Sequence, residues 1–200
     1  MKLTLIRHGI TQGNLEKRYI GRRNDQSLVP EGIRQLMEYQ AQGRYPQVDA
    51  VYSSPLKRCI ETASILYPLM TPVILPSLIE LDFGSFEGKD YEQLKTDPAY
   101  RRWIDTAGMY APTGGEDGAA FIARLKQALR QIAADADRLA IQHSAVVTHG
   151  GCIMTILSHL AKNSPSNRED FYRYRLKNGA GYTLDMDTQS LWMTSICPLV

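Results

Sequence analysis

The chain opens with the stretch MKLTLIRHG (residues 1–9), an apolar run that ends in a charged tripeptide. The run from residue 3 to residue 6 is too short for a helix and has the content of a buried strand. We expect it to be a parallel strand of an open α/β sheet, because such sheets bind ligands at the carboxyl ends of their strands. The tripeptide Arg7-His8-Gly9 therefore marks a candidate ligand site.

The chemistry of this tripeptide indicates phosphoryl transfer. Arg7 offers a planar fork of donors for phosphate oxygens, and His8 offers a nitrogen nucleophile. Gly9 lets a backbone amide approach a bound anion. Arg-His-Gly strings also occur by chance, and a histidine after a strand is more often a turn or core residue. The tripeptide alone therefore does not establish a functional site, and further motifs in the chain are needed.

Length and composition favour one globular domain over residues 1–200, since a chain of this size buries a sizeable core. The 23 Lys and Arg residues nearly balance the 21 Asp and Glu residues, which gives no general attraction to nucleic acid or to an anionic membrane. Three cysteines without a CxxC pair favour reduced thiols. No apolar run is long enough for a signal peptide or a membrane span, so we expect a cytoplasmic location. The oligomeric state stays open.

The first half of the chain predicts a loop over residues 10–29 that belongs to the active site, and it includes Gly21. A helix over about 30–42 follows, and then a strand at 49–52. The next helix is predicted to start with Ser54 as N-cap and Pro55 as its first residue. The side chains expected on the inner faces of these two helices are Ile33, Leu36, Met37 and Gln40, and Leu56, Cys59, Ile60, Ala63 and Tyr67.

The second half predicts a strand at 72–76, a glycine-punctuated loop at 78–88, and short helices over 90–105 broken at Asp97-Pro98. Residues 108–117 are expected to form a mobile flap. A long amphipathic helix is predicted over 116–138, a strand at 144–148, a helix at 152–160, and closing strands at 181–186 and 191–197.

Two further basic groups follow strands in the manner of the opening stretch. Arg58 lies in the first turn of a helix that follows a strand, so its charge and the helix N-terminus together suit an anion. His149-Gly150 follows the strand at 144–148. The non-functional alternatives are that Arg58 is a surface arginine and that His149 is a capping or core histidine.

Four separated motifs resemble the histidine phosphatase superfamily, in the branch that includes phosphoglycerate mutases and alpha-ribazole phosphatases. They are residues 7–9 with Asn14, residues 53–58 (SSPLKR), residues 78–88 (LIELDFGSFEG), and residues 149–150. The resemblance spans the whole chain. It implies a three-layer α/β/α fold with a mostly parallel central sheet, as in phosphoglycerate mutases.

The resemblance also implies roles for individual residues. His8 resembles the nucleophile that forms a phosphohistidine, which water then hydrolyses. Arg7, Arg58 and His149 resemble the phosphate pocket. Neutral donors are expected from Asn14 and from the amides of Gly9 and Gly150, and Gly21 is a further candidate for substrate binding. No metal or other cofactor is implied.

Glu80 resembles the proton donor of this family, which protonates the departing alkoxide and later takes a proton from water. Asp82 and Glu87 are rivals in the same loop, and Asp82 would share the side of Glu80 in an extended chain. Spacing alone does not rank the three carboxylates. The resemblance favours Glu80, while a solvated loop acid is the bland alternative.

We expect a metal-independent phosphomonoesterase that acts on a small phosphorylated metabolite, and an alpha-ribazole phosphatase of cobalamin assembly is the most specific reading. Residues 114–116 (GGE) resemble that branch, although Asp117 replaces its usual small hydroxyl residue. The alternatives are a phosphoglycerate mutase, a sugar phosphate phosphatase and a non-catalytic binding protein. Mutases carry a longer insertion and a closing tail, whereas this sequence ends at Val200.

The flap carries the prediction about the leaving group. Over residues 100–115, Trp103, Met109 and Tyr110 are expected to close on a bulky ring system. The alternative is that Tyr100 and Trp103 simply pack a short helix onto the sheet.

Overall fold

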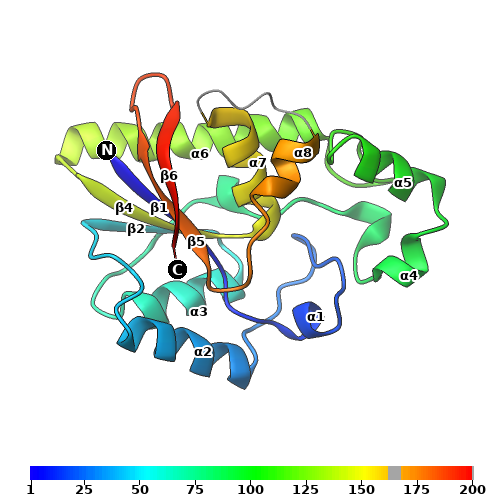
Figure 1. Cartoon of the computed structure of the whole chain (residues 1–200), viewed down its shortest axis with the longest axis horizontal. Coiled ribbons are helices and arrows are strands. Elements are labelled where there is room, and N and C mark those ends of the chain that lie inside the picture. Colours follow the sequence, from blue (N-terminus) through cyan, green and yellow to red (C-terminus); the bar gives the residue numbers. More distant parts are fainter. Residues whose placement is uncertain (162–167, 200) are drawn as a thin grey trace.

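The computed structural model describes residues 1–161 and 168–199. In these ranges a single six-stranded sheet has the order β3-β2-β4-β1-β5-β6 (Figure 1). The first four strands in this order are mutually parallel, β5 pairs antiparallel with β1, and β6 pairs antiparallel with β5. The mostly parallel sheet is confirmed. The strands are β1 (Lys2–Arg7), β2 (Ala50–Ser53), β3 (Val73–Ile74), β4 (His143–Thr148), β5 (Gly181–Met186) and β6 (Met193–Leu199).

Helices cover both faces of the sheet, which confirms the three-layer architecture (Figure 1). On one face, α2 (Pro30–Ala41) and α3 (Lys57–Leu66) pack with the β1 and β4 side chains of Ile6 and Val147. On the other face, α6 (Gly118–Leu139) and α7 (Gly150–Leu160) pack with Leu5 and Val146. Because side chains alternate along a strand, β1 and β4 contribute side chains to the cores on both faces of the sheet and are buried on both sides.

Short elements gather beyond the carboxyl ends of the parallel strands. They are α1 (Gln12–Leu15), the 3₁₀ turns η1 (Pro76–Leu78) and η2 (Gly84–Phe86), α4 (Tyr91–Leu94), α5 (Pro98–Asp105) and α8 (Arg168–Arg173). The break predicted at Asp97-Pro98 is present, and the Asp97 side chain accepts the amide of Ala99 as an N-cap. None of the helices in the described ranges combines the length and the apolar character that a membrane crossing requires.

The inner face of α2 differs from the one expected. Ile33 is 37% exposed and Met37 is 58% exposed, whereas Leu36 and Gly32 are buried. A Cβ at Gly32 would lie 2.7 Å from the Ile10 carbonyl oxygen, so glycine lets the helix approach the loop that follows β1. The prediction followed hydrophobicity, but this close backbone approach turns the helix by about one position.

The start of α3 also differs, because the helix begins at Lys57 with Leu56 as the N-cap residue. Ser54 does not cap the helix, since its hydroxyl is 2.7 Å from His149 Nε2. Cys59 and Ala63 are buried on the inner face as expected, while Ile60 is only half-buried.

Candidate active site

The pairing of β1 with β4 places two histidines together. Arg7 is in register with Thr148, so the residues that follow, His8 and His149, leave the same edge of the sheet side by side. The amide of His8 donates to the Thr148 carbonyl at 2.9 Å, and the two imidazole centroids are 5.3 Å apart. The structure therefore brings together the two strand ends that the sequence indicates.

His8 is held as a neutral imidazole with one free nitrogen. Its Nδ1 lies 2.7 Å from the Gly9 carbonyl oxygen, and a carbonyl oxygen only accepts, so Nδ1 carries the proton. Burial, followed by the charges of Arg58 and Arg7, lowers the pKa of His8 well below its ordinary value. Nε2 consequently keeps its lone pair, which is the state that a nucleophile requires.

Arg58 lies behind His8 and is almost fully buried. Its Nη atoms donate to the carbonyls of Asn24 at 2.9 Å and Gly21 at 3.1 Å, and its Nε lies 3.3 Å from His149 Nδ1. Since guanidinium only donates, His149 Nδ1 is an acceptor and the ring proton is on Nε2, facing Ser54. Burial and then the charge of Arg58 lower the pKa of His149, so a second neutral imidazole lies beside the first.

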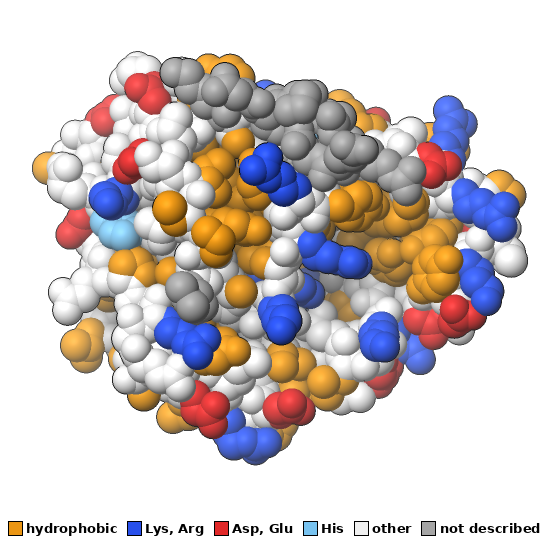
Figure 2. All heavy atoms as spheres, viewed as in Figure 1, with side chains coloured by type: hydrophobic (Ala, Val, Ile, Leu, Met, Phe, Trp, Pro, Cys, Tyr) orange, Lys and Arg blue, Asp and Glu red, His pale blue; other side chains and the backbone are white. Residues whose placement is uncertain are grey.

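A cavity of about 1110 Å³ opens in front of His8. Arg7, His8, Glu80 and Gly150 line it, while Arg58 and His149 lie behind these residues. Figure 2 shows a hollow to the right of the centre, with hydrophobic side chains inside it and Lys and Arg side chains around its edge. The Arg7 guanidinium donates to the Leu176 carbonyl at 2.7 Å, and its buried Nε has no protein partner. That Nε–H is a donor available to a bound phosphate.

The structure separates the three candidate carboxylates. Glu80 lines the cavity, whereas Asp82 and Glu87 do not. Burial by itself would raise the pKa of Asp82. The Gly84 amide and two arginine guanidinium groups outweigh burial and hold this pKa below its ordinary value. Glu87 accepts the amides of Gly21 and Phe83. Both rivals therefore act as acceptors in the loop framework.

Glu80 has the environment of a protonated acid. Its two carboxyl oxygens accept the amides of Leu81 at 2.9 Å and Gly151 at 3.1 Å. Burial raises the pKa of Glu80, and these hydrogen bonds together with the charge of Arg58 only partly offset this effect. A Cβ at residue 151 would lie 2.6 Å from Glu80 Oε1, so this glycine makes room for the carboxyl group.

Two of the glycines predicted to bind substrate have their amides occupied. The Gly9 amide donates to Thr62 Oγ1 at 2.9 Å, and the Gly21 amide donates to Glu87 Oε2 at 2.9 Å. Gly21 contributes instead through its carbonyl, which accepts Arg58. Asn14 and Gly150 line the cavity, and Asn14 Oδ1 accepts from Asn178 Nδ2 at 2.9 Å.

Of the two flap side chains predicted to bind the leaving group, only one lies in the cavity. Met109 lines the cavity, but Tyr110 lies outside the lining and stacks under the Arg102 guanidinium at 4.2 Å. The Thr113 carbonyl accepts the Ser85 amide, and the Glu116 amide donates to the Asp82 carbonyl, so this segment is attached to the loop that carries Glu80. Its mobility stays a prediction.

Aromatic side chains form the far wall of the cavity. Tyr100 and Trp103 are buried in the main core and also line the cavity. They therefore both pack the short helix α5 and face the space in front of His8. Tyr19 joins them through a hydrogen bond between its hydroxyl and that of Tyr100 at 2.7 Å and an edge contact with Trp103. The wall is therefore aromatic, with two tyrosine hydroxyl groups hydrogen-bonded to each other.

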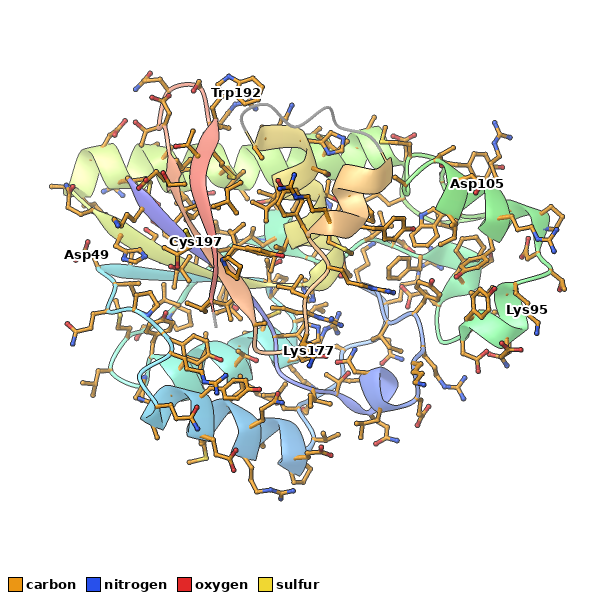
Figure 3. The ribbon with its side chains drawn as sticks, viewed as in Figure 1. Asp49, Lys95, Asp105, Lys177, Trp192 and Cys197 are labelled. Atoms are coloured by element: carbon orange, nitrogen blue, oxygen red, sulfur yellow. The ribbon has the colours of Figure 1, made fainter. Side chains whose placement is uncertain are left out.

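Sequence reasoning missed the segment between α8 and β5. Arg175, Lys177 and Asn178 line the cavity from this segment, on which Figure 3 labels Lys177. Burial lowers the pKa of Arg7, Glu80 opposes the shift, and the charge of Arg175 adds to it, which places Arg175 within electrostatic reach of Arg7. The segment carries no motif and follows no strand end, so only the three-dimensional structure reveals it. In the described ranges, no three His, Cys, Asp or Glu side chains are grouped as metal ligands.

Comparison with known proteins identifies the class. Residues 3–196 match the family model of the histidine phosphatase superfamily (branch 1). An adenosylcobalamin/alpha-ribazole phosphatase of Escherichia coli is 30% identical over 191 residues, which cover 94% of this chain and 91% of that protein.

Solved structures agree with this result. The alpha-ribazole phosphatase of Shigella flexneri superimposes with a TM-score of 0.79 at 28% identity, over 97% of this chain and 94% of that one. A mutant phosphoserine phosphatase of Entamoeba histolytica, in complex with phosphoserine, superimposes with a TM-score of 0.78 at 26% identity, over 98% and 95%. The chain belongs to the histidine phosphatase superfamily, branch 1. It is a phosphatase.

The position of Arg175 leads to a test of the missed segment. We expect Arg175→Gln to raise KM for a phosphate ester roughly 2- to 5-fold, the effect of losing an exposed ion pair, with kcat unchanged. Steady-state assays at low and high salt measure this change, and high salt should reduce the difference from wild type. Arg173→Gln is the control, because that exposed arginine does not line the cavity. An equal effect of both substitutions would contradict a role for Arg175.

Proposed function

We propose that this chain hydrolyses phosphate monoesters through a phosphohistidine at His8, with Glu80 as the general acid. The observation that carries the proposal is the pairing of these two groups in one cavity with the protonation states that the reaction needs. His8 has a free Nε2, and burial keeps Glu80 protonated at a higher pH than usual.

In the first step, Nε2 of His8 attacks phosphorus while the bond from phosphorus to the ester oxygen breaks. The electron pair of that bond goes to the leaving oxygen, which takes its proton from the Glu80 carboxyl. In the second step, the Glu80 carboxylate removes a proton from water, and the water oxygen attacks phosphorus. The bond from phosphorus to Nε2 breaks, and its electron pair returns to Nε2. Arg7 donates to the phosphoryl oxygens in both steps, and the charge of Arg58 behind His8 stabilises the negative charge on them.

The substrate we propose is alpha-ribazole 5'-phosphate, in cobalamin assembly. Relatives that cover more than nine-tenths of this chain carry the name alpha-ribazole phosphatase. The cavity supports the same choice, because Tyr19, Tyr100 and Trp103 form an aromatic wall suited to contact with the ring system of a nucleoside-like leaving group. The unpaired cysteines suit a reducing compartment, and we place the enzyme in the cytoplasm.

A second candidate has its own supporting observation. Lys17, Arg175 and Lys177 add positive charge to the cavity beyond what one phosphate requires. Such charge suits a leaving group with its own carboxylate, as in the phosphoserine bound by the Entamoeba histolytica relative. Comparing kcat/KM for alpha-ribazole 5'-phosphate and phosphoserine on the same preparation decides between them.

The nucleophile is tested by substitution. His8→Ala should abolish turnover and phosphoenzyme formation, because no other imidazole in the lining has a free nitrogen beside Arg7. Rapid quench with a radiolabelled ester, followed by acid and base treatment, measures the acid-labile, base-stable phosphate of phosphohistidine. His143→Ala is the control, since that histidine contacts Thr4 at the opposite end of β4. Phosphate retained on the His8 variant, or mapped to His149 in the wild type, would overturn the assignment.

The acid is tested through the leaving group and the pH. Glu80→Gln should slow hydrolysis of an alkyl phosphate by roughly 10²- to 10⁴-fold, but that of p-nitrophenyl phosphate by less than about 5-fold, because nitrophenolate departs without a proton. The raised pKa of Glu80 means that the acid is present below this pKa and lost above it. Alkyl phosphate turnover by the wild type should therefore fall as pH rises, and the variant should lose that limb. Equal losses on both substrates would point to a binding or structural role for Glu80, and no loss on either would leave Asp82 or Glu87 as the acid.

Met109 also lines the cavity, so the leaving-group site is tested with substitutions at Met109 and its neighbour Tyr110. Met109→Ala should raise KM for alpha-ribazole 5'-phosphate roughly 3- to 10-fold through lost apolar contact, with little effect on p-nitrophenyl phosphate. Tyr110→Ala is the matched control, because Tyr110 stacks with Arg102 outside the cavity. Steady-state kinetics on both esters measure the difference. If Met109→Ala affected neither ester, the ring-binding wall would lose its support.

A further inference from the structure

Arg124 on α6 is bound through every N–H of its guanidinium. Its Nε and one Nη2 hydrogen reach the two carboxyl oxygens of Glu116 at 2.7 and 2.8 Å. The other Nη2 hydrogen reaches the Glu80 carbonyl at 3.1 Å, and Nη1 reaches the carbonyls of Ser77 and Ile79 at 2.9 and 2.5 Å. Five donors thus make five hydrogen bonds, and three of them converge on the segment that ends at Glu80.

Glu116 holds the same loop from the other side of Glu80. Its amide donates to the Asp82 carbonyl at 2.9 Å, and its Oε2 lies 3.4 Å from the Asp82 amide. The backbone before Glu80 is therefore attached to Arg124, and the backbone after it is attached to Glu116. The bidentate ion pair joins these two attachments, and we call this pair with its backbone contacts the clamp.

The clamp is mostly buried, with side-chain exposures of 17% for Arg124 and 9% for Glu116. A buried ion pair is weak support for stability, because desolvation offsets most of the attraction between the charges. What a fully hydrogen-bonded pair provides is one fixed geometry. Here the geometry that it fixes belongs to residues 77–82, which comprise the end of η1 and most of the irregular stretch between η1 and η2.

Glu80 needs such support because its carboxyl group occupies a narrow place. It lies between the amides of Leu81 and Gly151, and only the missing Cβ of Gly151 leaves room for it. A backbone shift at Glu80 would move the carboxyl away from the leaving oxygen. Misplacement by about 1 Å costs up to ~10²-fold in rate when a reaction depends on positioning.

We propose that Arg124 and Glu116 are positioning residues that hold Glu80 where it transfers its proton. The proposal rests on the proposed function of Glu80 as the general acid. Neither residue of the clamp lines the cavity. The clamp therefore acts on the departure of the leaving group and leaves phosphate binding unchanged.

The test uses Arg124→Lys in the full-length enzyme, with glycerol 2-phosphate and p-nitrophenyl phosphate as substrates. Lysine keeps the charge but loses the fork of donors. We expect kcat for glycerol 2-phosphate to fall roughly 10- to 100-fold with KM within about 2-fold, and kcat for p-nitrophenyl phosphate to stay within about 3-fold. Arg130→Lys is the matched control, the same change at an exposed position of α6. Glu116→Gln should show the same selectivity, and it replaces Arg124→Lys if that variant does not fold.

The decisive measurement repeats Arg124→Lys in a Glu80→Gln background. If the clamp acts through Glu80, the second substitution adds no further loss on glycerol 2-phosphate. A full additional loss in that background, equal losses on both esters, or no loss in the single variant would overturn the proposal. Failure of the proposed function is visible separately, because then the wild type cleaves neither ester or Glu80→Gln alone shows no selectivity for the leaving group.

Discussion

The parallel pairing of β1 with β4 is the contact on which the arrangement of the site depends. It runs over six residue pairs, from Lys2 with His143 to Arg7 with Thr148. Both strands are buried on both faces, so a slip of one residue would exchange the side chains that meet the two helical layers. The apolar cores therefore set the register of the strands. The register in turn places His8 and the imidazole that follows Thr148 at one edge of the sheet.

Burial then sets the protonation of the reacting groups. Removing a group from water disfavours its charged form, which lowers the pKa of His8 and raises the pKa of Glu80. A nucleophile needs a lone pair and an acid needs a proton, and a single desolvated cavity supplies both conditions. The positive charge of Arg58 strengthens the effect on His8 and weakens it on Glu80. A bound phosphate dianion would offset that charge and favour the protonated carboxyl.

The sequence predicted the features that depend on local pattern. The strands before His8 and His149, the long amphipathic helix and the break at Asp97-Pro98 all follow from apolar spacing and turn residues. Features that depend on contacts between distant segments were wrong or missing. The Gly9 amide was predicted to donate to the bound phosphate, but Thr62 of α3 accepts its hydrogen bond. Arg175 carried no local signal, because it reaches the cavity only through the return of the chain toward β5.

The carboxylates show why a site is harder to predict than a fold. Glu80 and Asp82 are two residues apart, and an extended chain would treat them alike. Their environments differ through residues about 60 to 70 positions away, since Arg22 binds Asp82 and the Gly151 amide binds Glu80. Asp82 is thereby kept ionised as an anchor for the loop after β1, whereas Glu80 lies buried beside the cavity, where desolvation outweighs its two amide hydrogen bonds and the charge of Arg58. The difference in chemistry is therefore a property of the tertiary structure, and spacing along the loop does not contain it.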